Sequence, residues 1–126
     1  MIQASNKTMT TQQVADRFQE LAKQEKWFDI QDELFAENVR SIDPSGSPFF
    51  GYAEGKAQVR KKGEDWVSRI EAAHHLATTA PVVAGNCFAV GREVDITVKG
   101  HGRIQINEIM LYEVSKGQIV MEQFFY

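Results

Sequence analysis

The C-terminal part of the chain, from residue 71 onward, alternates apolar and polar residues in extended runs separated by glycine-containing turns. The pattern predicts long strands over residues 71–84, 87–99, 103–114 and 118–125. Strands of this length on one antiparallel sheet coil strongly, because every strand twists in the same sense. A coiled sheet has a concave face that another layer must cover.

The N-terminal half predicts the helices that form this covering layer. The first helix is expected to begin with a capping box of Thr10 and Gln13. Its apolar stripe consists of Val14, Phe18, Leu21 and Ala22. A second, shorter helix is predicted over residues 29–36, and an extended segment over 39–43 follows it.

A third helix is predicted to begin near Lys56, with an apolar stripe of Val59, Gly63, Trp66, Val67 and Ile70. A glycine inside a helix costs about 1 kcal/mol relative to alanine, so we expect close packing at Gly63. Helices first and a strand meander last predict an α+β fold, with three helices on a strongly curved, mainly antiparallel sheet that encloses a pocket. The 126 residues fit one domain over 1–126, with 1–8 as a flexible tail.

The charge and the N-terminus of the chain argue against nucleic-acid and membrane partners. The net charge is -3, and we interpret the basic residues Arg60, Lys61 and Lys62 as a solvated helix face. Residues 1–11 resemble neither a signal peptide nor a membrane anchor, which favours a cytoplasmic protein. The single cysteine, Cys87, suits a reducing compartment, and we interpret it as a small strand residue.

An acidic residue, Glu108, interrupts the apolar face of the third predicted strand. Alternation places it among Ile104, Ile106, Met110, Tyr112 and Val114. Because an unpaired carboxylate is costly to bury, Glu108 should be protonated, paired or open to a polar cavity. The alternatives to a functional site are a structural glutamate with a fixed hydrogen-bond partner and a glutamate at a dimer interface.

The other polar residues give weaker signals. Asp43 precedes a proline, where its simplest interpretation is a turn residue that caps a backbone amide. His74 and His75 are expected on opposite faces of a strand and His101 in a turn, so no metal site is predicted. No nucleophile elbow, no base placed beside Cys87 and no phosphate-binding glycine loop is recognisable, and no cofactor is predicted.

Aromatic residues are frequent in the segments near the two acids. Such residues more often form a core than a ligand cage, yet beside two acids they also suit a flat apolar ligand. The predicted pocket lining consists of Phe18, Trp27, Phe49, Phe50, Tyr52, Trp66, Met110 and Tyr112.

Three segments resemble the Δ5-3-ketosteroid isomerases. They are residues 34–48 (LFAENVRSIDPSGSP) with the glycine at 55, residues 107–112 (NEIMLY) and residues 117–121 (GQIVM). The pattern is shared with the SnoaL-like polyketide cyclases of the nuclear transport factor 2-like superfamily. The resemblance implies a cystatin-like cone, and it specifies a fold more closely than a reaction.

The resemblance also implies roles for two acids. Asp43 matches the general base that moves a proton between carbons next to a ketone. Glu108 falls at, or one residue from, the acid that stays protonated and donates a hydrogen bond to the enolate oxygen. Where the isomerases have a tyrosine on the first helix, this chain has Phe18, and loss of such a donor typically slows a reaction by about 10² to 10³.

We therefore expect a cofactor-free proton-transfer enzyme, of isomerase or cyclase type, that acts on an apolar ketone or enol. The alternatives are a non-catalytic protein that binds a small apolar molecule and a scaffold whose pocket is filled by its own aromatic side chains. A homodimer through the sheet is expected from apolar residues on the other face of the sheet. The candidates for this face are Phe88, Val90, Val94, Ile96 and Val98, and alternation leaves open which face each strand presents.

Overall fold

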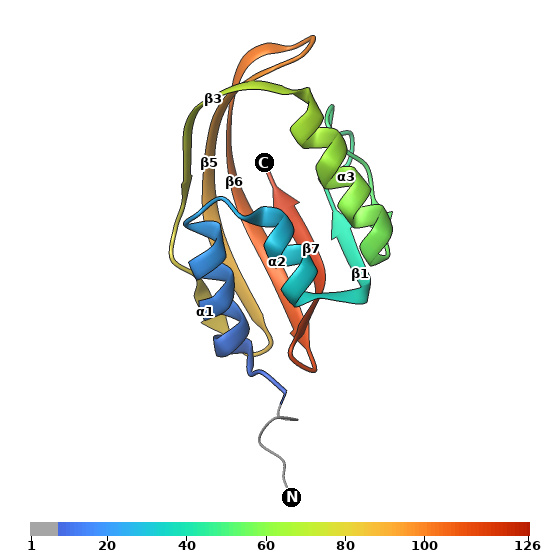
Figure 1. The fold of residues 1–126 in the computed structure, drawn as a ribbon, viewed down its shortest axis with the longest axis vertical. Coiled ribbons are helices and arrows are strands. Elements are labelled where there is room, and N and C mark those ends of the chain that lie inside the picture. The colour runs from blue at the N-terminus through green and yellow to red at the C-terminus, as the bar shows by residue number, and fades with distance from the viewer. Residues whose placement is uncertain (1–7) are drawn as a thin grey trace, which may run out of the picture.

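The computed structural model describes residues 8–126 as helices packed on one side of a sheet (Figure 1). The helices are α1 (Thr11–Ala22), α2 (Trp27–Leu34) and α3 (Lys56–Arg69). The strands are β1 (Phe35–Ile42), β2 (Ala53–Glu54), β3 (Ile70–Thr78), β4 (Val82–Ala84), β5 (Cys87–Val98), β6 (Gly102–Ser115) and β7 (Gln118–Phe125). The predicted α+β fold is confirmed. Of the predicted tail over 1–8, residues 1–7 lie outside the described part of the chain.

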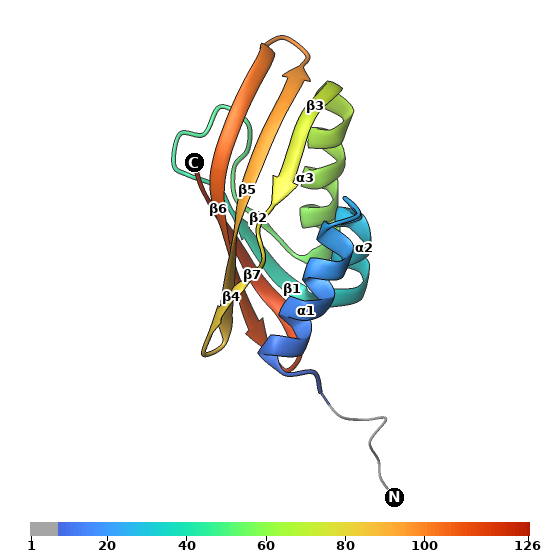
Figure 2. The same ribbon diagram turned by 90° about the vertical axis from the view of Figure 1, so that its left-hand side faces the viewer.

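The strands form a single curved sheet in the order β2-β1-β7-β6-β5-β3, and β4 pairs with β5. β1 is parallel to β7, and the other pairs are antiparallel. Figure 2 shows the sheet bending around the side on which all three helices lie. The helices therefore cover the concave face, as the cystatin-like cone requires.

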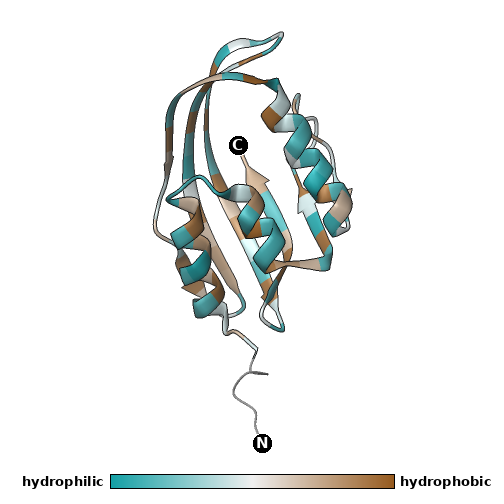
Figure 3. Ribbon diagram, viewed as in Figure 1, coloured by the Kyte–Doolittle hydropathy of each residue, from teal (hydrophilic) through white to brown (hydrophobic). Residues whose placement is uncertain are grey.

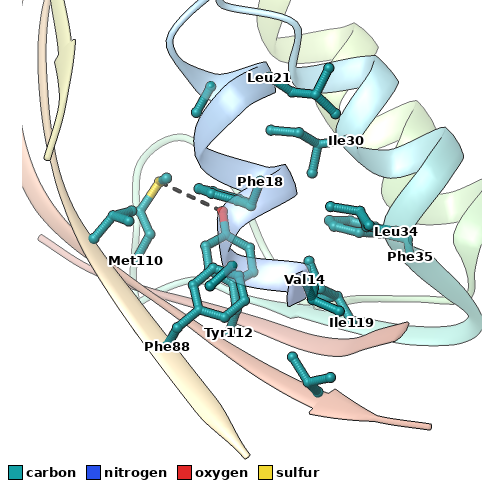
Figure 4. Packing of buried hydrophobic residues seen from close by; sticks show 14 of the residues in the cluster. Val14, Phe18, Leu21, Ile30, Leu34, Phe35, Phe88, Met110, Tyr112 and Ile119 are labelled. Carbon is teal, nitrogen blue, oxygen red and sulfur yellow. Dashed lines mark hydrogen bonds between the residues drawn. The ribbon is translucent and has the colours of Figure 1, made fainter. Parts of the chain in front are cut away.

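The first helix begins at the predicted capping box. Thr10 Oγ1 accepts a hydrogen bond from the Gln13 amide at 3.1 Å, and Gln13 Oε1 accepts one from the Thr10 amide at 2.8 Å. The apolar stripe of α1 lies on the sheet, where the ring centroid of Phe18 is 4.7 Å from Tyr112 and 5.2 Å from Phe88 (Figure 4). A dense core therefore fills the space between α1 and strands β5 and β6.

Two predicted element boundaries are wrong. The second helix ends at Leu34, because Phe35 has an extended backbone and pairs in parallel with Ile119 of β7. Sheet pairing and burial outweigh the helical pattern at this point. The predicted strand over 71–84 is two strands, because Pro81 cannot donate a ladder hydrogen bond.

The glycine in the middle of α3 lies where that helix meets α2. A Cβ atom at Gly63 would be 3.1 Å from Cε1 of Phe28 and 3.4 Å from Nε2 of Gln31. The missing side chain lets the two helices approach closely, which confirms the expected packing.

The two adjacent histidines of β3 lie on the same face of the sheet. His74 Nε2 is 2.8 Å from Thr97 Oγ1, and His75 Nε2 is 3.0 Å from Glu93 Oε1. Thr97 and Glu93 alternate along β5 with the buried residues of the inner face. The expectation of opposite faces is wrong because a β-bulge at this point of β3 inserts one residue.

The apolar residues of β5 that were candidates for the outer face lie on the inner face instead. Val90 is opposite Met110 and Val94 is opposite Ile106 on β6. Residues directly opposite each other in an antiparallel pair point to the same face. Alternation thus separates two sets of residues without saying which set is inside. The candidate set, Phe88, Val90, Val94, Ile96 and Val98, is buried.

The outer face has an apolar patch of its own. Val82, Ile109 and Phe125 are 73%, 51% and 48% exposed, and Ile109 is opposite Phe125 across β6 and β7. Val82 is on the same face, because it is opposite Ala89 of β5, an outward-facing residue. We call these three residues the outer patch.

The helices on the other side are mainly hydrophilic where they face the viewer in Figure 3. None of the helices in residues 8–126 is both long enough and apolar enough to cross a membrane.

Homodimerisation through the sheet is still a prediction. The outer patch is the surface through which we expect the two chains to contact each other. Ile109→Glu would place a carboxylate on each side of an apolar contact and should dissociate the dimer. Sedimentation velocity is expected to give twice the mass of one chain for wild type and the mass of one chain for Ile109→Glu. Lys99→Glu, in the turn after β5, is the control and should stay dimeric. A monomeric wild type would contradict the prediction.

Candidate functional site

A cavity of about 650 Å³ lies between the inner face of the sheet and helices α2 and α3. Its aromatic wall includes Trp27 of α2, Trp66 of α3, and Phe49 and Phe50 from the segment between β1 and β2. The rings of Phe49 and Phe50 meet the Trp66 ring edge to face, at centroid distances of 5.4 and 5.0 Å. The wall is therefore apolar and closely packed.

Two residues of the predicted lining lie outside the cavity. Phe18 is fully buried in the core, because α1 packs directly on the sheet and leaves no space there. Tyr52 is 57% exposed, and its hydroxyl donates to Glu54 at 2.9 Å on the surface. Met110 and Tyr112 of β6 do line the cavity.

The first predicted acid, Asp43, follows the end of β1 and lines the cavity, with its side chain 1% exposed. It forms an ion pair with Lys62 of α3. The Tyr126 hydroxyl donates to Asp43 Oδ2 at 2.6 Å, and Ser47 Oγ lies 2.5 Å from that hydroxyl. Burial and the bond to Asp43 raise the pKa of Tyr126 above its usual value. The side-chain partners of Asp43 therefore place it in the site and not only in a turn.

Lys62 connects α3 to the acids. Its side chain is 12% exposed, and Nζ also donates to Ser41 Oγ at 2.9 Å. The interpretation of Lys62 as part of a solvated helix face is therefore wrong. Lys62 lies three residues after Val59 and four before Trp66, so helical spacing alone would have placed it on the inner stripe.

A third acid, Glu122 of β7, lies next to this pair. Its side chain accepts a hydrogen bond from Ser41 Oγ at 2.7 Å, and the residue is 8% exposed. Burial raises the pKa of Glu122 to about 7, although the Ser41 hydrogen bond and the charge of Lys62 act in the opposite direction.

Glu122 was not predicted from the sequence, because β7 does not alternate regularly. Ile119 and Met121 pair with adjacent residues of β6, so Val120 is an extra residue in the ladder. The extra residue puts Glu122 on the same face as Ile119, three positions before it. No feature of the isolated sequence marks this bulge.

Glu108 lies on the inner face of β6, as alternation predicted, and it lines the cavity. Burial raises the pKa of its carboxyl to about 7. The positive charge of Arg92 opposes this shift, and the negative charges of Asp43 and Glu122 add to it. Glu108 therefore exists as a mixture of protonated and ionised forms at neutral pH.

Arg92 of β5 is opposite Glu108, but it binds another acid. Its guanidinium donates to both carboxylate oxygens of Glu25, at 2.9 and 2.8 Å. Its Cζ also lies 4.8 Å from the ring centroid of Trp27. Arg92 alternates with Val90 and Val94, and this spacing was the signal that could have placed it on the inner face.

Tyr112 of β6 is buried, and its ring centroid lies 4.7 Å from that of Phe18 on α1. The Tyr112 hydroxyl points toward Phe18 in Figure 4, and its hydrogen-bonding contact is a weak one, to Met110 Sδ at 4.0 Å. Burial raises the pKa of Tyr112 well above its usual value. Tyr112 is thus a protonated donor at neutral pH.

The site therefore combines two carboxyls that exchange protons near neutral pH with one fixed carboxylate–ammonium pair. Within residues 8–126, no three His, Cys, Asp or Glu side chains are grouped as ligands for a metal ion.

Removal of Lys62 should reveal how strongly the cavity depends on its ion pair. Lys62→Met leaves the Asp43 carboxylate buried without its cation and should lower the free energy of unfolding by about 3–5 kcal/mol, measured by urea denaturation. Lys61→Met, on the exposed side of α3, is the matched control and should change it by less than about 0.5 kcal/mol. The double variant Lys62→Met/Asp43→Asn should recover much of the loss. Equal effects of the two lysine substitutions would contradict this account.

Comparisons with known proteins agree with the fold. The sequence profile of the SnoaL-like domain matches residues 9–126. None of the curated proteins matches the sequence at a significant level.

Among solved structures, a protein from Mesorhizobium loti, described as a candidate SnoaL-like polyketide cyclase (carbohydrate phosphatase), is 31% identical with a TM-score of 0.87, over 94% of this chain and 100% of that chain. A nuclear transport factor 2-like protein of unknown function from Burkholderia pseudomallei is 15% identical with a TM-score of 0.73, over 94% and 92%. A protein of ketosteroid isomerase-like fold from Catenulispora acidiphila, in complex with trimethylamine, is 19% identical with a TM-score of 0.62, over 77% and 72%. The chain therefore belongs to the SnoaL-like domain family of the nuclear transport factor 2-like superfamily.

Proposed function

We propose that the protein is a cytoplasmic, cofactor-free enzyme that moves a proton on a carbonyl or enol compound bound in the cavity. The observation that carries this proposal is the position of Glu108. Its carboxyl has a pKa of about 7 and lies in a cavity with an aromatic wall. An acid–base catalyst works best when its pKa is near the operating pH, because it can then both accept and return a proton. The reaction class includes isomerisation and enolate-driven cyclisation.

The surroundings of the two predicted acids favour Glu108 as the group that carries the proton. Asp43 is engaged by Lys62 and by the Tyr126 hydroxyl, whereas Glu108 has no such bond from a side chain of the described residues. Proton transfer from carbon to Glu108 leaves an enolate, whose oxygen needs a hydrogen-bond donor. We assign this role to Tyr112, a cavity-lining residue whose hydroxyl makes only a weak contact, to Met110 Sδ at 4.0 Å.

The second candidate function is ligand binding without chemistry. The observation that favours it is Phe18, because an isomerase-like donor on α1 is absent and the ring is sealed in the core. The third alternative, a scaffold whose pocket is filled by aromatic side chains, is disfavoured by the cavity of about 650 Å³ beside Glu108. A protein of this fold from Catenulispora acidiphila is in complex with a small molecule, which supports ligand binding in both remaining candidates.

Proton exchange at carbon tests the proposal without knowledge of the natural substrate. We would measure the replacement of α-hydrogens of 2-tetralone, a flat ketone, by deuterium in D₂O near neutral pD, using ¹H NMR. The exchange rate with wild-type protein should exceed the rate in buffer alone. Glu108→Gln should lower this rate enhancement by a factor of about 10² to 10⁴. Asp43→Asn should also slow exchange, because it frees Lys62 and Tyr126 from their fixed positions.

The matched control is Glu113→Gln, which removes a glutamate from the outer face of the same strand. Its exchange rate should equal that of wild type. If 2-tetralone raises the melting temperature but exchanges at the buffer rate, the binding function replaces the enzymatic one. If Glu108→Gln and Glu113→Gln exchange equally fast, Glu108 is not the proton carrier.

A further inference from the structure

The charged groups that line the cavity are not balanced. Three cationic side chains line the cavity, Lys26, Lys62 and Arg92. Lys26 is exposed, whereas Lys62 and Arg92 are largely shielded from water and each already has a carboxylate partner. Lys62 is paired with Asp43, and Arg92 is paired with Glu25. Within residues 8–126, Glu108 and Glu122 form no ion pair of their own, although both line the same cavity.

The hydrogen-bond donors of Lys62 and Arg92 are also occupied. Besides its ion pair, Lys62 Nζ donates to Ser41 Oγ at 2.9 Å. Arg92 uses one nitrogen for Glu25 and for Thr78 Oγ1, at 2.9 and 3.1 Å, and the other nitrogen for Glu25 at 2.8 Å. These cations therefore have little capacity left for a negatively charged ligand.

Two acceptors of the cavity lack a hydrogen-bond donor from the described side chains. Gln31 Oε1 lines the cavity, is buried, and has no hydrogen-bond partner among the described residues. The carboxyl of Glu108 receives no hydrogen bond from a described side chain. Buried acceptors without donors are costly, so the cavity is complementary to a ligand that brings donors or positive charge.

The aromatic wall suits a cation as well. Ring faces carry partial negative charge and attract ammonium groups within about 6 Å. The protein already uses this contact at the edge of the cavity, where Lys62 Nζ lies 5.4 Å from the ring centroid of Phe50 and 5.7 Å from that of Phe124. Trp66 and Phe49 continue the same wall.

We propose that the ligand of this cavity carries a positively charged nitrogen, an ammonium group that lies between the aromatic wall and the carboxylates of Glu108 and Glu122. The inference rests on the proposed function only in taking the same cavity as the ligand site. If both hold, the substrate is a carbonyl compound that also contains a basic or quaternary nitrogen. Such a group neutralises charge that the protein leaves unpaired.

A proton balance accompanies this binding. Glu108 is faced by Arg92 from β5, by Asp43 after β1 and by Glu122 from β7, and these three charges together with burial set its titration. Glu122 is faced in addition by Lys62 from α3. Tyr112 and Tyr126 also line the cavity, but both stay protonated at neutral pH.

The carboxyls of Glu108 and Glu122 have pKa values of about 7. A cation binds to the ionised carboxylates, so its affinity should rise as the pH rises through this value, and binding should release protons. A single linked acid with a pKa of about 7 is about 9% ionised at pH 6 and about 91% at pH 8, which corresponds to about a tenfold change in affinity.

The experiment compares choline with 3,3-dimethylbutan-1-ol, its uncharged carbon analogue, by isothermal titration calorimetry. Choline has a charge that does not depend on pH, so any pH dependence belongs to the protein. We expect choline to bind at least tenfold more tightly than the alcohol at pH 8 and to lose about tenfold in affinity at pH 6. The alcohol should bind equally at both pH values. Choline binding should release about 0.9 proton per linked acid at pH 6 and about 0.1 at pH 8, measured by repeating the titrations in buffers of different ionisation enthalpy.

Substitutions identify which acids hold the ammonium group. The comparison of choline with the alcohol uses wild-type protein and therefore does not depend on whether the variants fold. Glu108→Gln and Glu122→Gln each remove a buried charge while retaining the shape of the side chain. Each should lower the affinity for choline at pH 8 by about tenfold or more. Glu113→Gln on the outer face should have no effect. Choline that binds no more tightly than the alcohol at pH 8, or that does not bind at all, overturns the inference.

The two proposals can fail separately. Exchange of 2-tetralone hydrogens without choline binding overturns the ammonium inference and leaves the proton-transfer function in place. Choline binding with the expected pH dependence supports the inference. The enzymatic function is then overturned if 1-methylpiperidin-4-one, a ketone that also carries an ammonium group, exchanges its α-hydrogens at the buffer rate.

Discussion

The ion pair between Asp43 and Lys62 is the interaction on which the cavity depends. It joins the end of β1 to α3, and both side chains are almost removed from water, with 1% and 12% exposed. Ser41 extends the connection, because its hydroxyl accepts from Lys62 and donates to Glu122 of β7. Two neighbouring strands and the helix above them are thus held by one polar network in which loss of a single member leaves a buried charge unpaired.

Two carboxyls beyond this pair make the cavity expensive to fold and useful for chemistry. Burial raises the pKa values of Glu108 and Glu122 from the ordinary 4.5 to about 7. Between these values the unfolded chain releases its protons first, so the free energy of unfolding falls as the pH rises toward 7 and then levels off. The tightly packed core under α1, with Phe18, Phe88 and Tyr112 in mutual contact, is the part of the fold that offsets this cost.

The positions of the helices and strands could be predicted from the sequence more accurately than the face of the sheet to which each side chain points. Helical spacing and the capping box at Thr10 located α1, and strict alternation placed Glu108 on the inner face of β6. Alternation failed wherever a bulge inserts a residue, as beside His75 in β3 and at Val120 in β7, because bulges leave no compositional mark. Lys62 was missed for a different reason: its neighbours in the sequence suggested a charged surface, although its spacing from Val59 indicated the interior.

The proposed proton transfer requires two glutamates in the cavity that titrate near neutral pH. Their titration can be followed by ¹³C NMR of protein labelled at the glutamate δ-carbon, from pH 3 to pH 9, with Glu108→Gln and Glu122→Gln used to assign the signals. We expect two carboxyl resonances with apparent pKa values of about 7, one missing in each variant. If the resonances of Glu108 and Glu122 titrate near 4 to 5 instead, the cavity is open to water and these carboxyls are not the proton carriers.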